Sequence, residues 1–157
     1  MQLLLGSDKS GFPLKEAIKA YLEQEKYSFD DIGTRDMDYA KPFFQVAPIA
    51  GERISKGEAD CAILVCGTGM GMNQVANKYP GVRAAVVESV YAAKMSRAIN
   101  DSNILTMGGW FIAPELGIEI VKTFLQTNFT QDLEAWRQEF LRNAKKEFAA
   151  IEKIIYQ

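Results

Sequence analysis

Apolar runs of strand length alternate along this chain with stretches of helical periodicity. Five runs have the length of buried strands and are followed by glycine or polar residues: Gln2–Gly6, Tyr27–Ile32, Cys61–Val65, Val82–Val87 and Ile104–Met107. Between the runs, apolar residues recur every three or four positions, as in Leu14, Ile18 and Leu22. Strands that alternate with helices predict one α/β domain over residues 1–157, built on a doubly wound, Rossmann-like parallel sheet.

The segment between the second and third runs, residues 34–48, is irregular and contains two prolines. We expect a third helix to start around this segment and to run towards Lys56, because Ile49, Ala50 and Ile54 are apolar. Pro48 would fit the first turn of that helix, but it would kink a helix that began much earlier.

The expected order of the five strands in the sheet is 2-1-3-4-5. In that order the first and third strands are neighbours, and the helices that follow them lie on opposite faces. Open α/β sheets bind their ligands in the crevice at the carboxyl ends of two such strands. Asp8 and Lys9 would therefore lie directly beside Cys66 and Thr68.

A long C-terminal helix is predicted over about residues 131–156, after the β/α set is complete. Its apolar residues recur at steps of three or four: Leu133, Trp136, Phe140, Ala144, Phe148, Ile151 and Ile155. No obvious face of the sheet remains for this apolar stripe to cover. We expect a partner subunit to cover it.

The main chemical signal is the glycine turn after the third run, Cys66-Gly67-Thr68-Gly69-Met70-Gly71. A strand, a glycine turn and a helix over Met72–Lys78 together aim backbone N–H groups at a bound anion. Cys66 ends the strand beside these donors, an environment that lowers the pKa of a thiol. Cys61, inside the strand, is expected to be a small buried hydrophobe.

A nucleotide site is the second interpretation of this turn. The spacing is Gly-x-Gly-x-Gly rather than Gly-x-Gly-x-x-Gly, and the turn follows a middle strand rather than the first. Glu88, about twenty residues downstream, could bind a ribose. No Gly-Lys-Ser/Thr closes the turn, so it is not a P-loop.

Composition argues against several classes of function. The chain has 157 residues, 48% of them hydrophobic, and a net charge of −2 without basic runs, so nucleic acid is not an expected partner. No stretch is long and apolar enough for a membrane span, and no signal peptide is recognisable. The two cysteines cannot pair within one extended strand, and free thiols indicate the cytoplasm.

The chain contains no histidine. Histidine is the commonest acid–base residue and the commonest metal ligand in proteins. A zinc site would need cysteines and carboxylates alone, and no Cys-x-x-Cys is present. We therefore expect no metal and no cofactor.

Several motifs in register over residues 1–137 resemble the ribose-5-phosphate isomerase B and galactose-6-phosphate isomerase family. They are Gly6–Asp8, Gly11–Lys15, Gly33-Thr34, Gly57–Asp60, Cys66–Gly71, Ala76–Lys78, Gly81–Ala84, Tyr91–Arg97, Asn100-Asp101 and Gly108-Gly109. The resemblance implies a cofactor-independent aldose–ketose isomerase for a small phosphorylated or otherwise acidic sugar. It also implies a homodimer, or a dimer of dimers, with the sites at the subunit interface.

The same resemblance assigns roles to residues of the glycine turn. Cys66 would be the base that moves a proton between C1 and C2 through a cis-enediolate, and Thr68 would assist at a substrate oxygen. The N–H groups of Gly67, Gly69 and Gly71 would hold the negative charge of the enediolate.

Other roles follow from the resemblance at more distant positions. Asp8 would bind substrate hydroxyls and Asn100 would line the pocket. Arg137 would reach an anionic end of the substrate across the dimer, and Lys9 is expected to face the same group.

The chain also departs from the family. Lys9 and Ile99 stand where family members usually carry histidine, and the histidine at the second position is assigned to opening the sugar ring. Residues 39–44 contain an insertion with a double phenylalanine that could shorten the pocket. Because Ile99 cannot transfer a proton, we expect a substrate that needs no ring opening, such as a four-carbon keto-sugar phosphate or an open-chain keto acid sugar.

A non-catalytic sugar-binding protein, or the partner subunit of a heteromeric isomerase, is the alternative function. One subunit type in the galactose-6-phosphate branch lacks the catalytic cysteine. Cys66 is present here with Thr68 and all three glycines, which favours a working enzyme.

Overall fold

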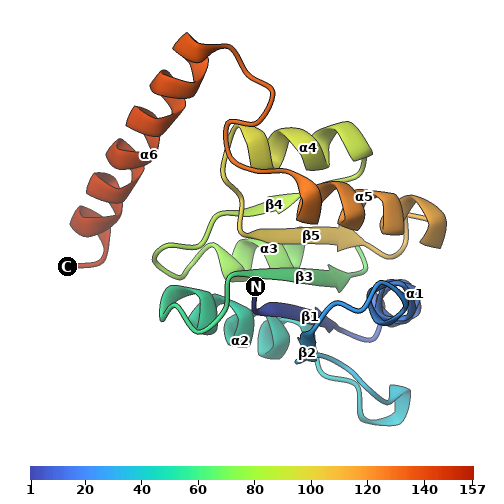
Figure 1. The fold of residues 1–157 in the computed structure, drawn as a ribbon. Helices are drawn as coiled ribbons and strands as arrows, with labels where there is room; N and C mark the ends of the chain where they lie inside the picture. The colour runs from blue at the N-terminus through green and yellow to red at the C-terminus, as the bar shows by residue number, and fades with distance from the viewer.

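A five-stranded parallel sheet forms the centre of the structure, a computed structural model that describes all residues 1–157 (Figure 1). The strands are β1 (Leu3–Ser7), β2 (Phe29–Asp31), β3 (Cys61–Cys66), β4 (Ala84–Val86) and β5 (Ile104–Gly108). The helices are α1 (Phe12–Gln24), α2 (Phe43–Ser55), α3 (Met70–Ala76), α4 (Val90–Ala98), α5 (Pro114–Gln126) and α6 (Ala135–Ile155), with a short 3₁₀ helix at Met37–Tyr39.

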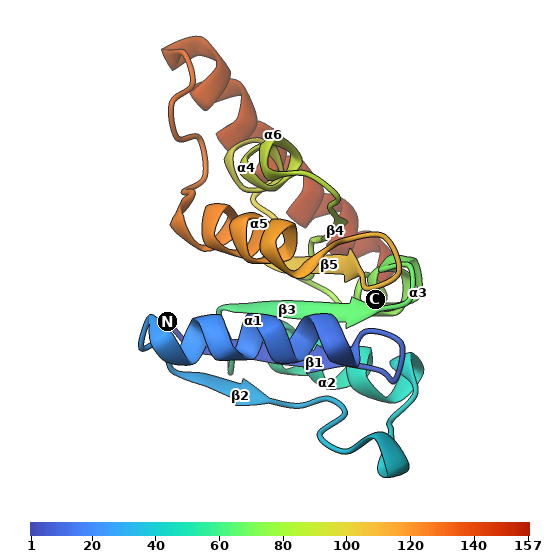
Figure 2. The ribbon, with the colours of Figure 1, turned by 90° about the vertical axis from the view of Figure 1, so that its right-hand side faces the viewer.

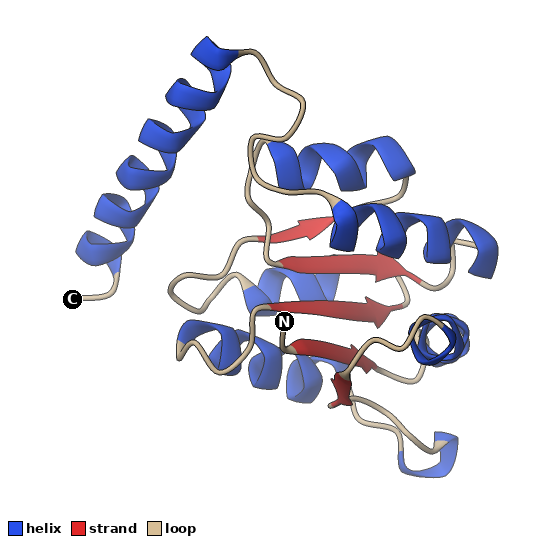
Figure 3. Ribbon diagram, in the orientation of Figure 1, coloured by secondary structure: helices blue, strands red, loops and turns tan.

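Helices cover both faces of the sheet, as predicted for a doubly wound fold (Figure 3). Leu3 and Leu5 of β1 point into one core, which α1, α4 and α5 complete. Leu4 points into the other core, where α2 and α3 pack. Figure 2 shows α1 lying across β1 and β3 with α2 behind them. The alternation of side chains along each strand thus produces two apolar layers, and the predicted fold class is confirmed.

The order of the strands is β2-β1-β3-β5-β4, so the predicted order 2-1-3-4-5 is wrong for the last two strands. All five residues of β5 are buried, and this strand pairs with β3 in the interior of the sheet. The expected buried strand over Val82–Val87 is only Ala84–Val86, with two half-buried alanines and an exposed Val86. A short strand with little apolar surface is suited to the edge of a sheet rather than its interior.

The outer edge of β4 is occupied by a side chain. The carboxamide of Asn77, which follows α3, donates to the Ala84 carbonyl at 3.0 Å and accepts from the Ala84 N–H at 2.9 Å. Both backbone groups of Ala84 that face away from β5 are therefore paired.

The helix α2 begins earlier than predicted. It starts at Phe43, directly after Pro42, and runs through Pro48. The apolar residues Val46, Ala47 and Ala50 are fully buried against the sheet. Their burial holds the helix together across the proline, which lacks one backbone hydrogen bond.

The last helix, α6, stands apart from the layered body (Figure 1). It begins later than predicted, at Ala135, because Thr130 and Asp132 adopt left-handed backbone angles (φ 63° and 58°) that interrupt a helix. None of its residues is buried. Polar contacts tie it to the body, including the Glu152 carboxylate, which accepts from the Gly81 N–H at 2.9 Å.

Much of the apolar stripe of α6 is exposed, with Phe140 at 64% and Ile155 at 66% exposure, although Phe140, Ala144 and Phe148 also line a cavity between α6 and the body. A partner subunit over this stripe remains a prediction. None of the helices combines the length and apolarity that crossing a bilayer requires.

Candidate active site

The turn between β3 and α3 folds back on the sulfur of Cys66. Gly69 has a left-handed backbone (φ 75°), and a Cβ at this position would lie 2.8 Å from the carbonyl carbon of Met107. Only glycine fits both conditions. The Gly69 N–H donates to the Cys66 sulfur at 3.1 Å, and the Met70 N–H donates to the Thr68 hydroxyl at 3.3 Å. An N–H donor interacts more strongly with a thiolate than with a neutral thiol.

The two cysteines have different surroundings. Cys61 lies at the other end of β3, where burial raises the pKa of its thiol to about 11. It packs in the core as predicted and is held protonated at neutral pH. Cys66 is also largely buried, but it ends its strand beside the glycine turn.

The loop after β1 contacts the same turn. The Asp8 N–H donates to the Val65 carbonyl at 3.2 Å, one residue before Cys66. A Cβ at Gly11 would lie 2.2 Å from that carbonyl oxygen, so the two loops approach each other through glycine. The expected neighbourhood of Asp8 and Cys66 is therefore present in the fold.

Burial and hydrogen bonding act in opposite directions on the pKa of the Asp8 carboxyl. Its carboxylate accepts from the Gly11 N–H at 2.9 Å. Burial nevertheless raises the pKa of Asp8, because desolvation outweighs the hydrogen bonds from the Gly11 and Ser10 N–H groups.

Two aromatic side chains flank the glycine turn. The ring of Trp110 would contact a Cβ at Gly67 at 2.7 Å, and the ring of Phe43 would contact one at Gly71 at 3.0 Å. The backbone N–H of Trp110 also donates to the Gly67 carbonyl at 3.1 Å. Sequence reasoning missed Trp110, whose place beside the turn of Cys66 depends on the pairing of β3 with β5 and has no local signal; its side chain is 67% exposed.

A cavity of about 300 Å³ opens between the loop after β1 and the start of α2. It is lined by Asp8, Lys9, Ala40, Lys41, Pro42, Phe43 and Phe44. Since the Phe43 ring also packs against Gly71, the cavity adjoins the turn of Cys66. The structure thus brings Asp8 and Lys9 together with the Cys66–Gly71 turn.

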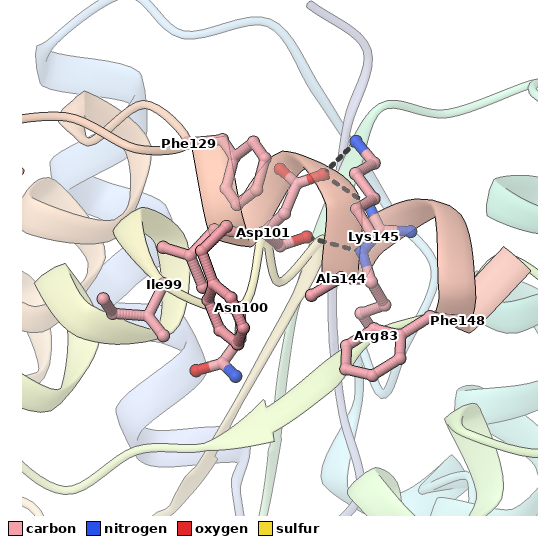
Figure 4. Close-up of a pocket in the computed structure, with 10 residues that line it drawn as sticks. Arg83, Ile99, Asn100, Asp101, Phe129, Ala144, Lys145 and Phe148 are labelled. Carbon is pink, nitrogen blue, oxygen red and sulfur yellow. Dashed lines mark hydrogen bonds and ion pairs between the residues drawn. The ribbon is translucent and has the colours of Figure 1, made fainter. Parts of the chain in front are cut away.

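Asn100 and Arg137 do not belong to this group within one chain. Parallel strands all point the same way, so Cys66 and Asp8 lie at the carboxyl edge of the sheet. Asn100 follows α4 and precedes β5, which places it at the opposite edge. There it lines a second cavity, of about 270 Å³, with Ile99 and the body-facing side of α6 (Figure 4).

Arg137 lies in the first turn of α6. Its guanidinium is 3.6 Å from the Glu134 carboxylate and lies over the Trp136 ring. The residues between α5 and α6 contact the end of α4, since the Thr130 N–H donates to the Ala98 carbonyl at 2.9 Å. Arg137 is therefore on the same side of the molecule as Asn100 and away from Cys66.

No group of three or more cysteine, aspartate or glutamate side chains is arranged to hold a metal ion. The groups available for chemistry at the carboxyl edge are one thiol, one hydroxyl, one carboxyl, lysine ammonium groups and backbone N–H donors.

Comparison with known proteins gives consistent similarities. The family model described as Ribose/Galactose Isomerase matches residues 3–140. A 4-deoxy-4-sulfo-D-erythrose isomerase from Clostridium sp. (strain MSTE9) is 60% identical over 157 residues, which cover 100% of this chain and 99% of that protein. D-erythrulose-4-phosphate isomerase 2 from Mycolicibacterium smegmatis is 36% identical over 131 residues, 82% of this chain and 86% of that protein.

Among solved structures, ribose-5-phosphate isomerase B from Clostridium thermocellum superposes with a TM-score of 0.87 at 34% identity. The match covers 99% of both chains.

Proposed function

Because this chain belongs to the ribose/galactose isomerase family and is an aldose–ketose isomerase, we propose a specific substrate class for it. The substrate is a four-carbon sugar whose C4 carries a sulfonate, interconverted between its erythrose and erythrulose forms. The observation that carries this proposal is the 60% identity, over the whole chain, to a 4-deoxy-4-sulfo-D-erythrose isomerase.

The chemistry of such a substrate agrees with the residues of the site. A four-carbon aldose closes a five-membered ring through its C4 hydroxyl, and a sulfonate in place of that hydroxyl leaves no group to close it. Five- and six-carbon aldose phosphates still close and must be opened before isomerisation. This chain has no histidine, and Ile99 stands where the family resemblance places the ring-opening residue. A substrate that is always open needs no such residue.

In the mechanism we propose, the Cys66 thiolate removes the proton from C2 of the aldose and delivers it to C1, while the hydroxyl proton of O2 passes to O1. The intermediate is a cis-enediolate whose negative charge develops on the substrate oxygens. The Thr68 hydroxyl and the N–H groups of Gly67 to Gly71 would stabilise that charge, because fixed donors act most strongly where charge forms. Asp8, at the same edge, would bind a substrate hydroxyl.

We further propose that each site is completed by a second copy of the chain. Asn100 and Arg137 lie at the opposite edge of the sheet from Cys66, so they can meet it only across an interface. The exposed apolar stripe of α6 is the surface that such an interface would bury. Two chains related by a twofold axis would then share two sites. With two free thiols, we place this enzyme in the cytoplasm.

The test uses solvent exchange together with turnover. The protein is incubated in deuterated water with the C4-sulfonated tetrulose, erythrulose 4-phosphate, ribose 5-phosphate and six-carbon phosphates. We expect deuterium at C1 or C2 and the highest kcat/KM for the four-carbon anions. A higher kcat/KM for ribose 5-phosphate would contradict the proposed substrate class.

The variant Cys66→Ser tests the proposed base. We expect it to lose both exchange and turnover by a factor of about 10²–10⁴, because a serine hydroxyl is a far weaker base at neutral pH. Ligand-induced thermal stabilisation should remain. If the wild-type protein binds these sugars but shows no exchange with any of them, it does not isomerise them, and the proposed substrate class is refuted.

A further inference from the structure

Two ammonium groups without acidic partners line the cavity beside the glycine turn. Lys9 comes from the loop after β1 and Lys41 from the segment before α2, cyan in Figure 1. Neither forms an ion pair with any carboxylate of the chain, in contrast to Lys15, Lys56 and Lys94. The nearest acceptor to the Lys41 ammonium is the Ile32 carbonyl at 3.5 Å, the outer limit of a hydrogen bond.

The backbone of Lys41 is held in place from the core of the protein. The fully buried Lys15 donates to the Thr34 carbonyl at 2.7 Å and pairs with Asp31 at 2.7 Å. The Thr34 hydroxyl accepts from the Lys41 N–H at 3.1 Å. Pro42 follows with a fixed backbone angle and starts α2. Lys41 is therefore a flexible cation on a fixed backbone at the rim of the cavity.

The cavity also has a low-dielectric wall. Phe43 and Phe44 line it and pack edge to face, with ring centroids 5.4 Å apart. Beside such a wall, charge–charge interactions are stronger than in open water. Asp8 is the one carboxyl in the lining, and N–H groups already bind it. Two cations against one occupied carboxyl give the cavity a net positive charge that favours an anion.

We propose that Lys41, acting with Lys9, binds the anionic group on C4 of the substrate and makes residues 39–44 the specificity element of this enzyme. The inference rests on the proposed function, because it needs a substrate whose reacting carbons lie at Cys66. The sugar carbons then extend from the glycine turn to the neighbouring cavity. The sulfonate or phosphate group on C4 lies there between the two ammonium groups. A short chain suits the arrangement because Phe43 contacts both the turn and the cavity.

The experiment removes the charge of Lys41 and keeps its bulk. The variant Lys41→Met is compared with Lys122→Met, a matched change at an exposed lysine of α5. Both are assayed with the C4-sulfonated tetrulose, with erythrulose 4-phosphate and with the neutral 4-deoxyerythrulose. We expect Lys41→Met to lower kcat/KM for the anionic substrates by about tenfold or more, since a hydrogen bond to a charged group is lost. Its kcat/KM for the neutral analogue should stay unchanged, as should all values for Lys122→Met.

A second measurement uses inorganic sulfate and phosphate as competitive inhibitors of the wild-type enzyme. Their inhibition constants should rise in Lys41→Met and rise further in the double variant Lys9→Met/Lys41→Met. Equal thermal unfolding of the variants shows that they are folded.

The outcomes separate the two proposals. If the wild-type enzyme does not isomerise the four-carbon anions, the proposed function fails. If it does, but Lys41→Met behaves like Lys122→Met with all three substrates, only the role of Lys41 is refuted. An equal loss with the neutral analogue would also refute it, because that pattern means structural damage rather than anion binding.

Discussion

The division of site residues between two edges of the sheet makes a quantitative prediction about mixed dimers. Cys66 ends a six-residue strand, and Asn100 lies at the edge where that strand begins, so the two are separated by roughly 20 Å, at 3.3 Å per residue. No side chain spans that length. If both residues serve one reaction, each site takes Cys66 from one chain and Asn100 from the other, together with Arg137 from the same side of that second chain.

The perturbation is to produce two inactive chains together, one with Cys66→Ser and one with Arg137→Glu. In a mixed twofold dimer one site then contains both changes and the other contains neither. Random pairing gives half mixed dimers with one intact site of two, so we expect recovery of about a quarter of the wild-type kcat/KM. The assay is turnover of the C4-sulfonated tetrulose at low substrate concentration, where loss of the arginine is most visible.

The matched control pairs Cys66→Ser with Asp8→Asn. Both residues lie at the carboxyl edge of the same chain, so every site in a mixed dimer is damaged and no activity should return. Recovery in the control, or no recovery in the test pair, would refute the shared site. A monomer that is active in sedimentation experiments would refute it as well.

Three further predictions concern stability. Burial raises the pKa of Cys61 to about 11 in the folded protein, whereas the pKa of the unfolded thiol is the ordinary 9.0. The protonated thiol therefore costs the folded protein nothing below pH 9, but the free energy of unfolding falls as the pH rises from 9 towards 11. Denaturant titrations at pH 8 and pH 10.5 should therefore show a loss of about 2 kcal/mol in wild type that is smaller in Cys61→Val. Gly69→Ala should lower the unfolding free energy by about 1–3 kcal/mol, because of the left-handed backbone and the contact with Met107, and an unchanged midpoint would contradict this. Lys15→Met should cost about 3–5 kcal/mol, since it leaves the buried Asp31 carboxylate with only the Lys19 ammonium at 3.9 Å, while Lys122→Met should have no measurable effect on the thermal midpoint.

Much of this structure follows from local patterns in the sequence. The burial of Cys61 to Cys66 in β3, the start of α1 near Pro13 and the turn at Gly69 each depend on residues close together in the chain. Local apolar runs and glycine positions are sufficient to predict these features. For the same reason, the neighbourhood of Asp8 and Cys66 was predictable once the first and third strands were paired.

The features that were missed depend on comparisons between distant segments. The order of β4 and β5 is decided by which strand offers more apolar surface, and Ala84-Ala85 offers less than Ile104-Leu105. The position of Lys41 depends on a buried lysine, Lys15, and on the contact of Phe43 with Gly71, none of which has a local signal. The start of α2 was misplaced because Pro48 suggests a helix start, whereas packing of the preceding turn decides it.

The paired groups of Ala84 bear on how copies of this chain can associate. An open strand edge recruits strands from other molecules, which leads to continuous intermolecular sheets and aggregation. Here the Asn77 carboxamide occupies the outward N–H and carbonyl of Ala84, so the edge offers no free pair at that residue to an incoming strand. If copies of this chain associate as proposed, contacts between side chains rather than backbone pairing at Ala84 would hold them together.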